Sequence, residues 1–192
     1  LNEDGYLETD LTVTKLSDDQ FLVVATDTMH NHVHAHMAHR LSRDWHATIT
    51  DVTARYAQIN LQGPRSRELL QKLTTRDMTQ DFDFRTAEEI DIGLARVLCM
   101  RITYVGELGY ELFIPAEQAT AVYDHILEVG KEFDMKHAGL KALGSLRMVC
   151  SSHILPHHKE KVRISQLLSP TLLCRRKKDI VTTVMTLIIQ IR

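Results

Sequence analysis

The chain has 192 residues, of which 44% are hydrophobic, and this is enough for one well-buried domain. A formal net charge of -2 gives no overall attraction to nucleic acid or to an anionic membrane surface. The three cysteines are widely spaced and form no Cys-x-x-Cys pair, which argues against a disulfide framework or a zinc ribbon.

Strand and helix patterns alternate along the chain. Period-two alternation and short β-branched runs predict strands, and apolar residues at intervals of three and four predict amphipathic helices. In chain order, the sequence predicts strands over 7–16 and 21–24, a helix over 29–41, a strand over 56–61, a helix after 63–64, strands over 94–104 and 110–114, a helix over 117–133 and a last helix around 140–146. This order favours an α+β domain, with antiparallel or mixed sheets covered by helices, over a doubly wound parallel sheet. There is no Gly-x-Gly-x-x-Gly after a strand, so a dinucleotide site is unsupported.

Charge changes abruptly near residue 148. Residues 149–192 hold 8 Lys or Arg and 2 Asp or Glu, a net charge of +6, which leaves -8 for residues 1–148. The apolar run near the end is shorter than the roughly 20 residues that a membrane helix needs, so no membrane span is expected. We predict a domain over residues 1–148 and a divergent basic and apolar tail over residues 149–192, poorly ordered or loosely helical. Because the chain begins at Leu1, we expect a fragment of a longer protein.

The most informative local pattern is Gly106-Glu107-Leu108-Gly109, between two predicted strands. Glycine permits positive φ and close backbone approach, so this segment suits a tight turn that presents the Glu107 carboxylate to a ligand. A plain β-hairpin with an acidic turn residue is the alternative.

Three further segments belong with this turn: residues 5–15 and 60–66, which precede it, and residues 138–147, which follow it. With residues 104–112 they resemble the folate-binding domain of the glycine-cleavage T-protein (aminomethyltransferase) family. Within that family they are most similar to the C-terminal part of sarcosine and dimethylglycine dehydrogenases and of the pyruvate dehydrogenase phosphatase regulatory subunit. The resemblance stops near residue 148, so we expect the tail to be non-family sequence.

This resemblance implies a tetrahydrofolate-binding domain for one-carbon (methylene) transfer, present as a fragment of a sarcosine or dimethylglycine dehydrogenase-like flavoprotein. FAD is then expected only in an upstream flavin domain of the parent, and the implied location is the mitochondrial matrix. We expect folate as the small-molecule partner, no nucleic-acid partner, and no turnover by the fragment alone. A non-catalytic regulatory module like the phosphatase regulatory subunit is the alternative, and a stand-alone T-protein is a third option.

The resemblance also assigns roles to five residues. Asp10 matches the acidic residue that contacts the amine side of the folate and assists methylene transfer, and a carboxylate there can stabilise developing positive charge. Glu107 matches the glutamate that orients the pterin, because one carboxylate can accept two adjacent donors. Arg147 matches an arginine that holds the folate from the last helix, and Tyr104 and Tyr110 would form an aromatic wall. The alternatives are a strand-surface Asp10, a helix-surface Arg147 and core tyrosines.

A histidine-rich tract covers residues 29–40, with His30 and His34, and His32 and His36, each one helical turn apart. Such pairs can chelate a divalent ion. A solvated helix face gives the same pattern, and no His-Glu-x-x-His motif is nearby. We therefore expect no physiological metal site, and only weak adventitious binding of zinc or nickel.

Overall fold

A computed structural model of the chain describes residues 2–26, 28–79, 81–150 and 186–191. Its elements in chain order are β1 (Leu11–Lys15), β2 (Gln20–Ala25), α1 (His30–Arg40), β3 (Ala47–Asp51), η1 (Thr53–Arg55), β4 (Tyr56–Gln62), α2 (Ser66–Leu73), β5 (Ala87–Ile92), β6 (Ala95–Met100), β7 (Gly109–Pro115), η2 (Ala116–Gln118), α3 (Ala119–Gly130), η3 (Lys131–Phe133), α4 (Leu140–Cys150) and β8 (Thr186–Ile191). The paired strands that the structure describes are all antiparallel. The predicted α+β class is confirmed.

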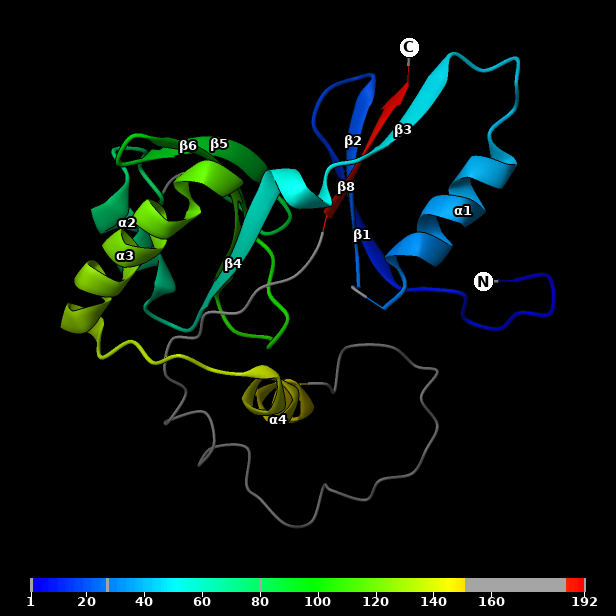
Figure 1. Ribbon diagram of the computed structural model, residues 1–192. Helices are drawn as coiled ribbons and strands as arrows, with labels where there is room; N and C mark the ends of the chain where they lie inside the picture. Colours follow the sequence, from blue (N-terminus) through cyan, green and yellow to red (C-terminus); the bar gives the residue numbers. More distant parts are fainter. Residues whose placement is uncertain (1, 27, 80, 151–185, 192) are drawn as a thin grey trace, which may run out of the picture.

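The strands form two four-stranded sheets, which Figure 1 shows beside one another. Sheet A has the order β1-β2-β8-β3, and sheet B has the order β4-β7-β6-β5. In sheet B, β4 and β7 pair along their full lengths, from Tyr56 opposite Pro115 to Gln62 opposite Gly109. These two strands are the longest of the described sheets, and they form the base on which the candidate site is built.

Apolar clusters on successive faces of the sheets arrange the elements in layers. Helix α1 covers one face of sheet A, where its buried Val33 packs against Val23 and Ala25. On the opposite face of β2, Leu22 packs against Phe113 of sheet B. Helices α2 and α3 cover the remaining face of sheet B and close the largest apolar cluster, which includes Leu61, Leu69, Leu70, Val97, Tyr110, Leu112, Ile114, Val122 and Ile126. Both faces of sheet B are therefore buried in its central strands.

Hydrophobic spacing predicts the amphipathic helices well. The helix expected over residues 29–41 is α1, and the one expected over residues 117–133 is the continuous run η2–α3–η3. Val122 and Ile126, one turn apart, are 3% and 0% exposed. An amphipathic helix buries its apolar face against any apolar surface, so the spacing of apolar residues alone is enough to predict it.

The strand predicted over residues 94–104 is wrong at both ends. Leu94 is fully exposed in a two-residue turn between β5 and β6, where Gly93 adopts a φ of 59°. Pairing with β7 stops at Met100 opposite Glu111, so β6 ends there. Strands β3 and β5 were not predicted, because each is short and carries only two inward-facing apolar side chains.

The tail prediction is wrong for residues 186–191, which form β8 in the interior of sheet A. In register, Ile189 lies opposite both Phe21 of β2 and Ile49 of β3. A β-branched apolar segment is well suited to a strand with a partner on each side. Residues 149 and 150 of the tail form the end of α4, and residues 151–185 and 192 lie outside the described residues. The non-family origin of the tail stays a prediction.

Within the described ranges, none of the helices combines the length and apolarity that crossing a membrane would require.

Truncation after residue 185 should loosen sheet A and leave sheet B intact. Loss of β8 removes a hydrogen-bonded neighbour from both β2 and β3, so we expect their amides to exchange faster. Hydrogen exchange followed by mass spectrometry is the measurement, with β4 and β7 as the internal reference. Equal protection of β2 and β3 in the full and truncated chains would show that β8 does not hold this sheet together.

Candidate functional site

Residues 101–108 form a loop between β6 and β7. The tight glycine turn predicted for this segment is wrong. The antiparallel pairing of β6 with β7 ends at Met100 opposite Glu111, so a longer loop joins the two strands. Gly106 does adopt a positive φ, of 70°, as expected for a glycine in such a loop. Glu107 therefore lies in an eight-residue loop, and contacts outside the β6–β7 pairing must hold this loop in place.

The first of these contacts is made by Gln62, at the end of β4. A Cβ placed on Gly109 would lie 2.2 Å from the Gln62 Oε1, so only glycine leaves room for this amide. Gln62 is fully buried and its Oε1 accepts a hydrogen bond of 2.6 Å from the Thr103 hydroxyl. The β4 strand thus holds the 101–108 loop through a side chain that crosses β7 at Gly109.

The same loop touches the segment that begins α2 and the segment that forms α4. The Gly63 N–H donates to the Leu108 carbonyl at 2.8 Å, and the Ser66 hydroxyl donates to it at 3.3 Å. On its other side, Val105 is 1% exposed and packs with Leu143 and partly buried residues of the α4 region. Figure 1 shows α4 at the end of the molecule to which this loop extends. Three of the four sequence segments singled out above therefore meet at one loop.

The fourth segment, β1, lies beside the start of this loop. The Thr14 hydroxyl contacts the Met100 Sδ at 3.4 Å. A groove of about 500 Å³ lies between β1 and residues 85–87 and 100–102, and Lys15, Arg85 and Arg101 are among its lining residues. This positive lining suits a negatively charged part of a ligand.

The structure places the predicted site residues unequally. Asp10 is exposed directly before β1, and Glu107 is half-buried in the 101–108 loop. Tyr104 is 41% exposed in the same loop. Arg147 belongs to α4, and its side chain lies outside what the structure describes. The structure thus brings the segments of Asp10, Glu107 and Arg147 to one loop and its surroundings.

Tyr110 occupies a core position. It is fully buried, its ring lies 5.9 Å from that of Phe82, and its hydroxyl accepts a hydrogen bond of 3.2 Å from the Arg67 Nε. These contacts correspond to the core alternative for this tyrosine, and they leave Tyr104 as the solvent-accessible aromatic of the pair.

A row of buried amides on one face of β4 was missed from the sequence. Gln58, Asn60 and Gln62 are 1%, 3% and 0% exposed. Among the described residues, the Gln58 Oε1, the Asn60 Oδ1 and the Gln62 Nε2 have no hydrogen-bond partner. The alternation of polar and apolar residues in β4 was visible, but it predicts a solvated face. Buried polar atoms without partners are costly, so this row marks a place where a ligand or water can complete hydrogen bonds.

Glu111 of β7 lies next to this row. It is the register partner of Asn60, and its Oε2 accepts a hydrogen bond of 2.8 Å from the Gln58 Nε2. Burial raises the pKa of this carboxyl group to about 7. Glu111 can therefore change protonation state near neutral pH, beside the buried amides of β4.

Similarity to known proteins extends over most of the chain. The model of the GCVT N-terminal domain matches residues 1–158, which include β1, the 101–108 loop and α4. The chain belongs to this family.

Curated relatives of this GCVT-type chain have several different names. It is 36% identical over 148 residues to 4-methylaminobutanoate oxidase (formaldehyde-forming) of Paenarthrobacter nicotinovorans, and this alignment covers 77% of this chain and 18% of that protein. It is 34% identical over 150 residues to the mitochondrial pyruvate dehydrogenase phosphatase regulatory subunit of Mus musculus, covering 77% and 17%. It is 33% identical over 146 residues to an aminomethyltransferase of Caldanaerobacter subterraneus subsp. tengcongensis, covering 76% and 39%. The GCVT-type chain therefore spans well under half the length of each of these relatives.

Replacing Gly109 by alanine should destabilise this GCVT-type domain by roughly 1–3 kcal/mol, because the new Cβ forces the buried Gln62 amide to move. Gly139→Ala is the matched control, since a Cβ there meets nothing within 4 Å. Urea denaturation of both variants is the measurement. If the two substitutions have the same effect on the free energy of unfolding, close packing of Gln62 against Gly109 is not what fixes glycine here.

Glu111→Gln should remove a pH-dependent destabilisation. The folded-state pKa of about 7 lies above the ordinary value of 4.5, so the folded chain holds this proton more tightly than the unfolded chain. Protonated Glu111 therefore contributes to the free energy of unfolding of the natural chain. This contribution is fully present below pH 4.5 and is lost as the pH rises through 7. We expect the free energy of unfolding of Glu111→Gln, relative to that of the natural chain, to rise by roughly 3 kcal/mol between pH 4 and pH 8.

The measurement is denaturation at both pH values, with Glu117→Gln as the control for loss of a charge at an exposed position. A stability difference between the Glu111→Gln and natural chains that does not change with pH would contradict burial of this carboxyl group.

Proposed function

We propose that this chain is a tetrahydrofolate-binding module for one-carbon (methylene) transfer. The observation that carries the proposal is that the 101–108 loop contacts both the start of α2 and the α4 region, and that β1 lies beside the start of this loop. These are the segments through which the sequence resembles folate-binding domains. They are far apart along the chain, so a shared ligand site gives a reason for their common position.

The residues present fit a reduced folate in their chemistry. A pterin edge offers several N–H donors, and Glu107 supplies a carboxylate acceptor on the loop. The buried Asn60 Oδ1 and Gln62 Nε2 are an acceptor and a donor without partners among the described residues. Lys15, Arg85 and Arg101 line the groove beside β1 and would suit the carboxylates of a folate tail.

Each of the three charged site residues has a distinct proposed role. A bound reduced folate would supply the amine nitrogens that accept a one-carbon unit. Asp10, at the start of β1, would accept a hydrogen bond from such an amine and stabilise positive charge near it. Glu107 would fix the orientation of the pterin, and Arg147 of α4 would help to retain the ligand. The carboxylate of Asp10 would hold the proton that the amine gives up.

The parent protein is proposed to be a sarcosine or dimethylglycine dehydrogenase-like flavoprotein. Two relatives whose lengths far exceed this chain, the oxidase and the phosphatase regulatory subunit, leave room for further domains. In the proposed parent, an upstream domain holds FAD and oxidises an N-methyl amine, and the present module receives the one-carbon unit. A mitochondrial matrix location belongs to the same proposal.

A non-catalytic regulatory module is the second candidate function. It is favoured by 34% identity to the pyruvate dehydrogenase phosphatase regulatory subunit of Mus musculus. Such a module would keep the fold for protein contacts and would have no need of folate. The presence of both Asp10 and Glu107 supports the folate proposal over this alternative.

Reduced-folate binding by the full chain is the test, with 5-formyltetrahydrofolate as a stable probe in isothermal titration calorimetry. Glu107→Gln and Asp10→Asn should each weaken binding by about 1.5–3 kcal/mol, because each removes a charged hydrogen-bond acceptor. That loss corresponds to roughly a tenfold to hundredfold higher Kd.

The exposed Glu117 provides the control, and Glu117→Gln should bind as the natural chain does. Circular dichroism of each variant shows whether the fold is kept. Absence of saturable binding to the folded natural chain would contradict the folate proposal and favour the regulatory one. Equal affinity in all variants would remove Asp10 and Glu107 from the site.

A further inference from the structure

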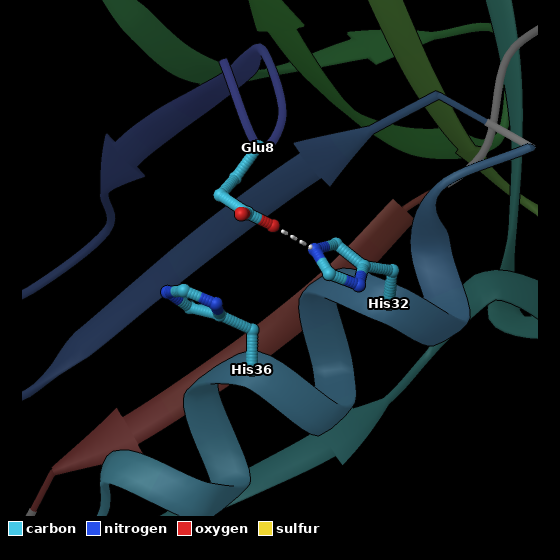
Figure 2. A group of neighbouring side chains, drawn as sticks. All are labelled: Glu8, His32 and His36. Carbon is cyan, nitrogen blue, oxygen red and sulfur yellow. Dashed lines mark hydrogen bonds and ion pairs between the residues drawn. The ribbon is translucent and has the colours of Figure 1, made fainter. Parts of the chain in front are cut away.

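Glu8, His32 and His36 form a compact cluster outside the site described above. The two imidazoles lie one turn apart on α1, and the carboxylate comes from the segment that leads into β1. Figure 2 shows the three side chains directed into the same space between this segment and the helix. One candidate ligand atom from each residue lies within 4.8 Å of the other two, and this is the one group of three such residues found in the described part of the chain.

The position of the cluster is set by packing of the helix. Val33 is 2% exposed and, together with Met37, faces Val23 and Ala25 of sheet A. Because α1 is fixed by this apolar face, His32 and His36 project from a neighbouring face with a defined orientation. Their mutual spacing is therefore built into the helix.

The contacts within the cluster are those of groups that can change partners. The His32 Nε2 lies 2.8 Å from the Glu8 Oε2, and the ring centroids of His32 and His36 are 5.9 Å apart. Among the described residues, the His36 ring has no hydrogen-bond partner. One carboxylate thus faces two imidazoles and satisfies only one of them.

The histidine tract alone gave no reason to expect a metal site, but the structure adds Glu8 to it. We propose that Glu8, His32 and His36 bind a divalent transition-metal ion, with Zn²⁺ as the best match. Imidazole nitrogen and carboxylate oxygen are zinc ligands, and a set of two histidines and one glutamate leaves a fourth position for water. Ligand atoms around a tetrahedral zinc ion lie roughly 3.3 Å apart, so the side chains must close by about 1.5 Å at most from the observed separation. Small torsional changes in partly exposed side chains supply that movement.

Metal binding would replace the Glu8–His32 hydrogen bond. The His32 ring would bind as neutral imidazole, with its one proton on Nδ1 and the lone pair of Nε2 directed to the ion, and a ring protonated at both nitrogens would first release one proton to solvent. The Glu8 oxygen would become a second ligand. Affinity therefore falls in acid, where imidazoles are protonated. The ion would also tie residues 2–10 to α1, since Glu8 is the ligand that lies outside the helix.

Zinc titration of the full chain by isothermal calorimetry is the test, with Co²⁺ as a spectroscopic substitute that reports tetrahedral ligands by its visible absorption. His36→Gln and Glu8→Gln should each weaken Zn²⁺ binding by at least about tenfold. The matched control is the double variant His30→Gln, His34→Gln, which removes the other pair of histidines one turn apart on the same helix. Every variant keeps other histidines that can bind Zn²⁺ weakly. The quantity compared is therefore the change in Zn²⁺ affinity that each substitution causes.

Hydrogen exchange provides a second readout. Zn²⁺ should slow exchange in residues 2–10 of the natural chain and of the control, but not in Glu8→Gln. Equal zinc affinity in the natural, His36→Gln and Glu8→Gln chains would overturn the proposal. A loss in His36→Gln with none in Glu8→Gln would overturn it too, because it would reduce the site to a pair of helical histidines. A loss as large in the control would show binding by the helix as a whole and would have the same consequence.

Discussion

The pairing of β4 with β7 is the interaction on which the rest of the structure depends. One face of this pair carries Leu61, Leu112 and Ile114 into the apolar cluster beneath α2 and α3. The opposite face carries Phe113 into the contact with sheet A. Because both faces are covered, a shift of the register by one residue would place the Gln58 and Asn60 amides into the apolar cluster. The register is therefore strongly determined, and it sets Gln62 opposite Gly109.

That register positions the 101–108 loop at some energetic cost. The Gln62 amide anchors the loop through Thr103, but it belongs to a row of buried amides whose polar atoms are only partly paired among the described residues. Protein interiors seldom keep such atoms unless they serve a purpose, since an apolar row would pack without this penalty. The row and the loop share Gln62, so stability is given up at the place where the candidate ligand site is formed. The same trade is common where binding groups must be fixed before a ligand arrives.

Local patterns in the sequence predicted what depends on local spacing. The apolar stripe of α3 and the Val33 side of α1 could be read directly, because a helix needs only a surface on which to bury them. The glycine pair at residues 106 and 109 was recognised, but its geometry was not, since Gly109 is required by Gln62 from another strand and not by a turn. Tyr110 could equally have faced a ligand, and only its contacts with Phe82 and Arg67 place it in the core. The nearness of Glu8 to His32 depends on how β1 and α1 pack, and no local pattern contains that information.

The insertion of β8 into sheet A has a consequence for how the chain folds. Gln20 pairs with Gln190, although almost the whole sequence separates them. Closing so large a loop is slow, and chains dominated by such distant contacts fold slowly. During synthesis, sheet B can assemble from residues 56–115, whereas the edges of β2 and β3 that face β8 stay unpaired until residues 186–191 arrive. Exposed strand edges recruit other strands, so the interval before β8 arrives is when a nascent chain is most vulnerable to aggregation and most in need of a chaperone.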